Sequence, residues 1–176
     1  MKWILVGLGN IGSEYDGTRH NVGRDVIDAL AKKFPQNLKA AEINVYMNNS
    51  GGPIKKLVPS KKAAERLVVV HDDLDLGLGK VKISFGSGSG GHRGVESVIK
   101  ALKTRDFVRV RVGISPTTPS GKVKKPDSKK VVDFVLGKFR ASELEKLKKV
   151  KKVVFDGLSL LASDGLGKAM TEVNSR

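Results

Sequence analysis

The sequence predicts a single α/β domain of three layers, with a mixed, mostly parallel twisted sheet flanked by helices. Short apolar runs typical of buried strands occur at 2–6 and 67–70. At 21–34 and 141–161 apolar residues recur at three-to-four spacing, which is typical of amphipathic helices. Because strands that alternate with helices form parallel sheets covered on both faces, this order of segments predicts the fold class.

The other elements follow from the same signals. We expect strands at 42–47, 80–85 and 107–114, the last with one basic face because Arg alternates with Val. A small helix is expected within 54–65 and a longer one at 95–102. Residues 86–91 and 115–130 are rich in Gly, Ser, Pro and Lys and are interpreted as loops, the second one mobile. No linker divides the chain, so one domain is expected over 1–176.

Charge and composition narrow the class of protein. The chain has 33 Lys and Arg against 18 Asp and Glu, and the net charge of +15 favours a polyanionic partner such as nucleic acid. Apolar runs of the ~18 residues that span a membrane are missing, so no membrane partner is expected. The sequence contains no cysteine, which excludes disulfides and Cys-ligated zinc, and a cytoplasmic location is expected.

A glycine-rich turn follows the first strand. Residues 7–12 fit the pattern G-x-G-x-x-G of dinucleotide-binding loops. However, the polar stretch 13–18 follows where a helix should begin, and Asp25 and Asp28 lie within a helical pattern instead of ending a second strand. We therefore interpret the turn as a tight loop that brings the backbone and Asn10 close to a ligand.

Two further clusters carry groups with catalytic potential. His20 lies where the loop meets the first helix, and a histidine there is either a general base or a surface or capping residue. The segment 71–75, His-Asp-Asp-Leu-Asp, follows the strand at 67–70, where α/β ligands bind. Its carboxylates fit three interpretations: orienting a histidine, holding a divalent metal, or forming a solvated turn. The residues alone leave these alternatives open.

In their order along the chain, these clusters resemble the bacterial-type peptidyl-tRNA hydrolases. The matching segments cover nearly the whole chain, and they are 6–23, 46–51, 71–82, 88–94, 109–114, 131–139 and 165–170. The resemblance implies an α/β fold and hydrolysis of the ester that joins a peptide to the tRNA 3′ end. It implies that no metal or other cofactor is needed. It also implies a role in recycling tRNA from aborted translation, and a monomer whose partner is peptidyl-tRNA.

The resemblance also implies roles for individual residues. His20 matches the general base that activates a water, Asp72 the carboxylate that keeps this histidine competent, and Asn10 the residue that positions the substrate. Residues expected to bind substrate or tRNA are Tyr15, Tyr46, Asn48, Arg93, Arg111 and Lys82. Among them, Asn48 is expected to orient water or the peptide carbonyl, and Arg111 to form half of a basic clamp on the tRNA 5′-phosphate.

Three departures from the family pattern affect the substrate-holding residues and the sheet. Arg93 stands where the family usually has Asn, which replaces a donor and acceptor by a charged donor. Ser84 stands at the second position of the phosphate clamp, and Lys82, two residues earlier on the same strand face, is the expected substitute. The stretch between His20 and Asn48 is shorter than usual, so one strand or hairpin between residues 34 and 46 is expected to be lacking, leaving its neighbour as an exposed edge.

Two other functions remain as alternatives. One is an RNA-binding relative of the same fold with weak or no catalysis, which the substitutions at Arg93 and Ser84 suggest. The other is a metal-dependent phosphoesterase that uses Asp72, Asp73 and Asp75. The first would bind tRNA without releasing it from an ester, and the second would lose activity in EDTA.

Overall fold

The computed structural model describes residues 2–176 and contains one five-stranded sheet in the order β2-β1-β3-β5-β4. β1 pairs in parallel with β2 and β3, β3 pairs in parallel with β5, and β4 runs antiparallel to β5. The strands are β1 (Trp3–Gly7), β2 (Leu38–Ala40), β3 (Leu67–Gly77), β4 (Val81–Phe85) and β5 (Val108–Ser115). The sheet is therefore mixed and mostly parallel, as the sequence predicts.

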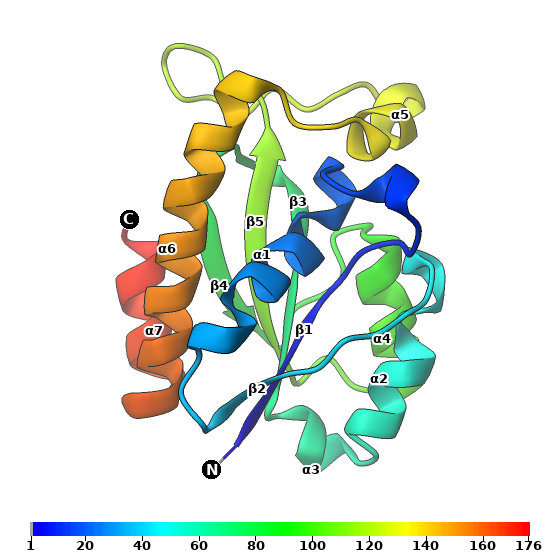
Figure 1. Cartoon of the computed structure of the whole chain (residues 1–176), viewed down its shortest axis with the longest axis vertical. Helices are drawn as coiled ribbons and strands as arrows, with labels where there is room; N and C mark the ends of the chain where they lie inside the picture. Colours follow the sequence, from blue (N-terminus) through cyan, green and yellow to red (C-terminus); the bar gives the residue numbers. More distant parts are fainter. Residues whose placement is uncertain (1) are drawn as a thin grey trace.

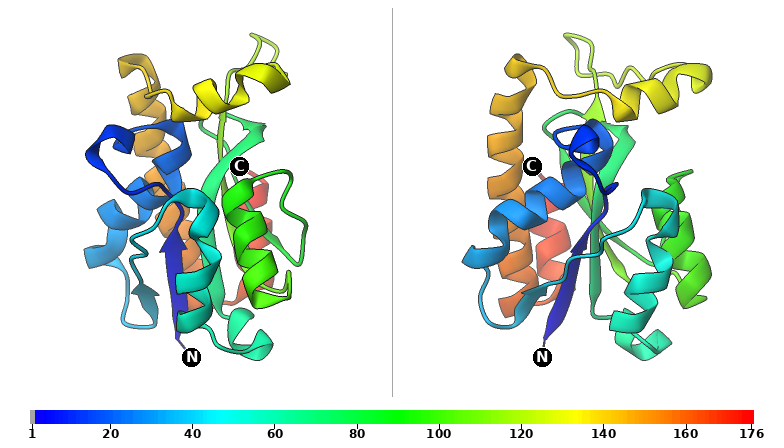
Figure 2. Two further views of the ribbon diagram at one scale, coloured as in Figure 1. Left: turned by 90° about the vertical axis from the view of Figure 1, so that its right-hand side faces the viewer. Right: turned by 45° about the vertical axis from the view of Figure 1, so that its right-hand side comes forward.

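Helices cover both faces of this sheet, which gives the three expected layers. Figures 1 and 2 show α1, α6 and α7 on one face, α2, α3 and α4 on the other, and α5 beyond the carboxyl ends of β3 and β5. The helices are α1 (Val22–Leu30), α2 (Gly51–Leu57), α3 (Lys61–Ala64), α4 (Arg93–Leu102), α5 (Val131–Leu136), α6 (Ala141–Ser163) and α7 (Leu166–Asn174). None of the helices within residues 2–176 is long and apolar enough to cross a membrane.

Two clusters of buried apolar side chains lie between the sheet and the helices on its two faces. One packs α1, α6 and α7 on the sheet, with Val26, Leu158 and Val68 among its buried residues. The other packs α2, α3 and α4 on the opposite face, with Ile54 and Val98 among its buried residues. Burial of these aliphatic side chains supplies the main driving force for folding, at about 25 cal/mol for each Å² removed from water.

The region between residues 34 and 46 differs from the prediction in detail. The strand expected at 42–47 is wrong, because the chain there is irregular and ends in a 3-10 turn at Met47–Asn49. The strand β2 forms earlier instead, and its pairing ends where the Ala41 amide donates to the Leu5 carbonyl at 2.8 Å. Beyond this point Ile43 and Met47 are buried in the apolar cluster that also contains residues of α2 and α4.

Two glycines let α1 approach the sheet backbone to backbone. A Cβ added at Gly23 would lie 2.1 Å from the Val70 carbonyl oxygen, and one at Gly7 would lie 2.3 Å from the Gly23 carbonyl oxygen. Both distances are too short for any side chain, so only glycine permits this packing. The beginning of α1 is thereby fixed against the ends of β1 and β3, and the turn that precedes the helix carries His20.

Candidate active site

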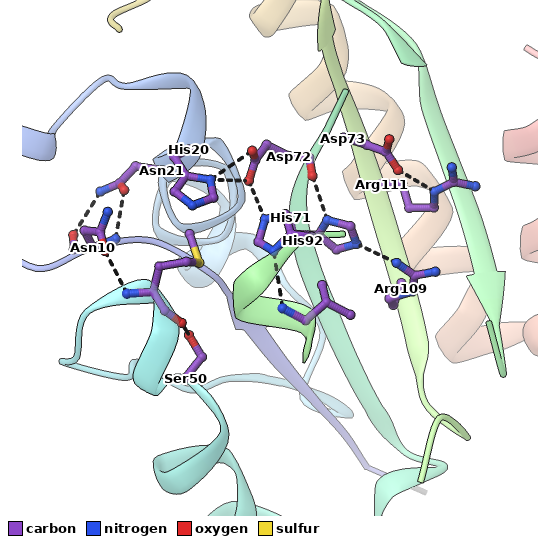
Figure 3. Close-up of polar contacts among 12 residues, drawn as sticks. Asn10, His20, Asn21, Ser50, His71, Asp72, Asp73, His92, Arg109 and Arg111 are labelled. Carbon is purple, nitrogen blue, oxygen red and sulfur yellow. Dashed lines mark hydrogen bonds and ion pairs between the residues drawn. The ribbon is translucent and has the colours of Figure 1, made fainter. Parts of the chain in front are cut away.

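His20, Asp72 and His92 meet at the carboxyl ends of the parallel strands (Figure 3). His20 lies in the 3-10 turn Arg19–Asn21, Asp72 lies in β3, and His92 is the N-cap residue of α4. His20 Nδ1 lies 3.0 and 2.9 Å from the two Asp72 carboxylate oxygens. His92 Nε2 lies 2.7 Å from Asp72 Oδ1. One buried carboxylate thus holds two imidazoles that come from separate elements.

The hydrogen bonds define where the protons lie on these two rings. The Val95 amide donates to His92 Nδ1 at 3.2 Å, so Nδ1 has no proton and Nε2–H is the donor to Asp72. His20 faces the same carboxylate with Nδ1, so Nδ1–H donates to it. His20 Nε2 is left with its lone pair, and His20 lines the adjacent cavity. This is the tautomer that a general base requires.

Electrostatics keep Asp72 ionised although it is only 2% exposed. Burial by itself raises the pKa of a carboxyl group, but the attraction of His92 and the hydrogen bonds from His20 and His92 outweigh burial and hold the pKa of Asp72 well below its usual range. A carboxylate that stays charged can orient His20 and stabilise the imidazolium that forms when His20 takes a proton.

A second buried pair, His71 and Arg109, supports the site from behind. His71 Nδ1–H donates to the Asp72 carbonyl at 2.7 Å, and Arg109 Nη1 donates to His71 Nε2 at 3.3 Å. Burial, followed by the electrostatic interactions with His92 and Arg109, lowers the pKa of His71 well below its usual range, so His71 stays neutral. Arg109 Nη2 also donates to Ser87 Oγ at 2.5 Å and to the Gly88 carbonyl at 2.6 Å, which ties the glycine-rich loop to the sheet.

This arrangement corrects the expected basic face of β5. Arg109 is only 5% exposed and uses its donors inside the protein. Arg111, the next residue on that face, is partly exposed. A strand side chain near the middle of a covered sheet is buried whatever its charge. The alternation of side chains along a strand places Arg109 and Arg111 on the same face and cannot tell which of them is buried.

Asn10 is held so that its amide donors remain available. Its backbone amide donates to Asn21 Oδ1 at 2.8 Å, and Asn21 Nδ2 donates to the Asn10 carbonyl at 3.0 Å. The Met47 amide donates to Asn10 Oδ1 at 2.7 Å. Because the side-chain oxygen is occupied, Asn10 offers the adjacent cavity its Nδ2–H donors, which no group within residues 2–176 accepts.

A cavity of about 500 Å³ opens beside these residues. One wall is polar and includes Asn10, His20, Asn48 and Arg93. The opposite wall is apolar and is formed by the helix α5 through Val131, Val132, Val135 and Leu136. The cavity volume suits a small ligand or the reactive end of a larger one, and the mixed lining suits a substrate with polar and apolar parts.

Arg19 fixes α5 over this cavity. Its guanidinium lies 4.5 Å above the Phe134 ring and donates to Glu143 Oε2 at 3.1 Å. The Arg19 amide also donates to the Gly137 carbonyl at 3.0 Å. The residue next to the catalytic candidate His20 therefore anchors the wall opposite to it.

The other expected binding residues lie around the cavity rim. Tyr46, Asn48 and Arg93 line the cavity, and Tyr46 is 51% exposed. Tyr15 contacts Tyr46 edge to face, with ring centroids 6.3 Å apart. Arg111 lies farther along β5, directly opposite the exposed Lys82 in β4, so the expected neighbours do share one face. Arg111 Nε donates to Asp73 Oδ2 at 2.7 Å.

The structure does not bring the three aspartates together. Asp72 binds histidines, Asp73 binds Arg111, and Asp75 binds Lys125. Among residues 2–176 the one group with metal-binding potential is His20, Asp72 and His92, with ligand atoms within 4.8 Å of one another. His92 fits a metal poorly, since its Nδ1 accepts the Val95 amide and its Nε2 must then keep its proton. The donor set fits a hydrogen-bonded catalytic pair better than a metal site.

The backbone that follows residues 7–12 excludes the interpretation of this turn as a dinucleotide-binding loop. The chain continues into 3-10 turns at Ser13–Tyr15 and Arg19–Asn21, and α1 begins only at Val22. The glycine-rich turn therefore lacks the helix N-terminus that a pyrophosphate needs.

Sequence reasoning missed three of the residues that build this site. The roles of His92, Asn21 and Arg109 depend on contacts with residues at least 11 positions away. The only local signal for His92 is its position before a helix, where it caps α4. The helix α5, which carries the apolar wall, was expected only as a matching segment of the family.

The chain is similar to known peptidyl-tRNA hydrolases over most of its length. The sequence profile described as peptidyl-tRNA hydrolase matches residues 4–45 and 38–176. The peptidyl-tRNA hydrolase of Thermodesulfovibrio yellowstonii is 35% identical over 192 aligned positions, with 97% of this chain and 98% of that protein covered. That of Fervidobacterium nodosum is 37% identical, with 98% and 96% covered. A chloroplastic peptidyl-tRNA hydrolase of Arabidopsis thaliana is 36% identical over all of this chain and 66% of its own.

Solved structures lead to the same assignment. The crystal structure of peptidyl-tRNA hydrolase from Acinetobacter baumannii superposes with a TM-score of 0.80 at 26% identity, over 99% of this chain and 95% of that one. A crystal structure of peptidyl-tRNA hydrolase with N-propanol gives 0.81 at 27% identity, with the same coverage. The profile and the relatives both span nearly the whole chain, which therefore belongs to the peptidyl-tRNA hydrolase family.

Proposed function

We propose that this chain hydrolyses the ester between the peptide and the tRNA 3′ end by general-base catalysis with His20. The observation that carries the proposal is the pairing of His20 Nδ1 with the ionised Asp72, which leaves Nε2 as a base beside the cavity. In this mechanism Nε2 removes a proton from water as the water attacks the ester carbonyl, and Asp72 stabilises the resulting imidazolium. The proton then passes to the departing ribose oxygen.

The residues around this pair position the ester. Asn10 donates from Nδ2 to a substrate carbonyl, because its Oδ1 is already occupied by the Met47 amide. Asn48, at the same wall of the cavity, orients the water or the peptide carbonyl. An ester is an activated substrate, so a positioned water, a base and amide donors for the developing oxyanion suffice without a cofactor.

Lys82 and Arg111 form the clamp for the tRNA 5′-phosphate in this proposal. They are directly cross-strand in the antiparallel pair β4–β5, where Cβ atoms lie about 4.5 to 5.5 Å apart. Both side chains are cationic and start from one face of the sheet, and Arg111 donates to Asp73 through Nε, which leaves its terminal N–H groups for a phosphate. Tyr15 and Tyr46 supply aromatic faces at the cavity rim for the 3′ end.

We also propose that β2 replaces a longer segment of the family. The alignment with the Thermodesulfovibrio protein spans 192 positions although this chain has 176 residues, so it contains gaps in this chain. The family profile matches two stretches that overlap at residues 38–45, where β2 lies. The cytoplasmic location and the monomeric state stay predictions.

Release of tRNA from N-acetylaminoacyl-tRNA tests the proposed function. Wild type is expected to release tRNA, and His20→Ala to lose at least ~10²-fold in kcat while it still binds the substrate. Full activity of His20→Ala would disprove the role of His20. Binding without release by the wild-type chain would instead identify an RNA-binding relative, and loss of release in EDTA would indicate a metal-dependent enzyme.

A further inference from the structure

A second hollow, the α2–α4 groove, continues from the active-site cavity. It has a volume of about 670 Å³, within the range of about 300 to 1,000 Å³ typical of ligand sites. Asn48 and Arg93 line both the cavity and the groove, so the two are adjacent along one path. Figure 2 shows α2 and α4 side by side on the face of the sheet opposite α6.

The groove is strongly positive. Its charged lining residues are Lys55, Arg93, Lys100, Lys103 and a single acid, Glu96. Glu96 accepts a hydrogen bond from Ser89 Oγ at 3.2 Å, and no carboxylate within residues 2–176 pairs with any of the four cations. Unpaired cations around a concave surface favour an anionic ligand.

The two helices that form the groove, α2 and α4, are in direct contact. A Cβ added at Gly51 in α2 would lie 2.1 Å from the Ser97 carbonyl oxygen in α4, so the two helices touch backbone to backbone. The Gly51 amide also donates to Ser97 Oγ at 3.0 Å. This contact fixes the distance between the two helices that carry the exposed residues Lys55 and Lys100.

We propose that the α2–α4 groove binds acidic residues of the peptide part of the substrate and makes the enzyme prefer peptides with carboxylates upstream of the ester. This rests on the proposed function. The ester has two arms, and the tRNA arm must reach Lys82 and Arg111 on β4 and β5. The peptide arm leaves past Asn48 and Arg93, and this path leads into the groove. Carboxylate side chains are the anions that a peptide offers there.

Hydrolysis of three matched substrates tests this preference. They share one tRNA and an N-acetylated tripeptide ending in alanine, with two aspartates, two asparagines or two lysines upstream. For two partly exposed ion pairs we expect the KM of the aspartate substrate to be about 3- to 10-fold lower than that of the asparagine substrate. The lysine substrate is expected to have the highest KM of the three. Added salt is expected to reduce the difference, because the charges are screened.

The double variant Lys55→Gln/Lys100→Gln is expected to abolish the difference between the aspartate and asparagine substrates. Lys103 is left unchanged because its φ of 55° makes substitution there a test of backbone strain. The matched control is Lys61→Gln/Lys149→Gln, which removes the same charge from exposed lysines outside both hollows and is expected to keep the preference. An equal fall of kcat/KM for all three substrates in the groove variant would overturn the proposal and assign the groove to RNA.

Titration with the free N-acetylated tripeptides separates this proposal from the proposed function. Amide chemical shifts next to Lys55 and Lys100 are expected to move with the aspartate peptide at lower concentrations than with the asparagine peptide. If no substrate is hydrolysed, the proposed function fails, and this titration still decides on the groove. Equal binding of the three peptides would overturn the groove's preference for acidic residues.

Discussion

Replacing Asp72 by Asn tests the central ion pair most directly. In the wild type the imidazolium that forms on His20 faces a carboxylate oxygen at 2.9 Å. With about 4 Å between the charge centres and an effective dielectric constant of about 20, the lost attraction is about 4 kcal/mol, or roughly 10³-fold in kcat. The amide oxygen can still accept from both rings, but the amide nitrogen then replaces Oδ2, which lies 2.9 Å from the Nδ1–H of His20. Two donors face each other, so His20 must change its tautomer or orientation.

Single-turnover hydrolysis of N-acetylaminoacyl-tRNA under excess enzyme measures this loss, and circular dichroism confirms that the variant is folded. Asp73→Asn serves as the matched control. It removes a carboxylate that binds Arg111 instead of a histidine, so kcat is expected to stay nearly unchanged and the effect is expected in KM. A kcat for Asp72→Asn within about tenfold of the wild-type value would refute the electrostatic role assigned to Asp72.

Three further predictions concern the surrounding residues. Burial, followed by the charges of Asp16 and Asp28, raises the pKa of Asp25 to about 6, so ionisation of Asp25 costs folding free energy as pH rises from about 4 to 6. Asp25→Asn should therefore stabilise the protein by about 1 kcal/mol at pH 8, after allowance for solvent screening, and not at pH 4; equal melting temperatures of variant and wild type at pH 8 would contradict this. Arg109→Met should lower stability in urea by about 2 to 3 kcal/mol and increase amide exchange at 86–91, because the Gly88 carbonyl and His71 Nε2 lose their donor. Arg109→Lys should lose less. Arg19→Met should increase amide exchange in α5 and raise KM; unchanged exchange at 131–140 would show that α5 is held by other contacts.

The part of the fold that depends on local pattern was predictable from the sequence. The strands at 2–6 and 80–85 and the helix at 141–161 were expected within a few residues of β1, β4 and α6. Each combines a regular spacing of apolar residues with clear boundary residues, and both signals depend only on residues close together in the sequence. The three-residue strand β2 carries too little pattern to be recognised, because the pairing with β1 creates it.

The candidate site was predictable for a different reason. His20 and the segment 71–75 were conspicuous as residue types at strand ends, yet only the family resemblance singled out Asp72 from its neighbours. The difference among the three aspartates lies in their partners across 38 to 52 residues of sequence, with Asp72 facing His20 and Asp73 facing Arg111. Burial separates Arg109 from Arg111 in the same way, and neither sequence spacing nor charge reports it.

The close contact of Gly7 and Gly23 has a consequence for protein engineering. Replacing a helix glycine by alanine usually gains about 1 kcal/mol of helix propensity, which makes Gly23 an obvious target in α1. Here a methyl group would meet the Val70 carbonyl at 2.1 Å and push the helix away from β3, which carries Asp72. Gly167 in α7 meets no atom within 4 Å and offers the same gain without that cost. Stabilisation of this enzyme should therefore begin at the C-terminal helix α7, where an added methyl group does not press on the strands that carry the candidate catalytic residues.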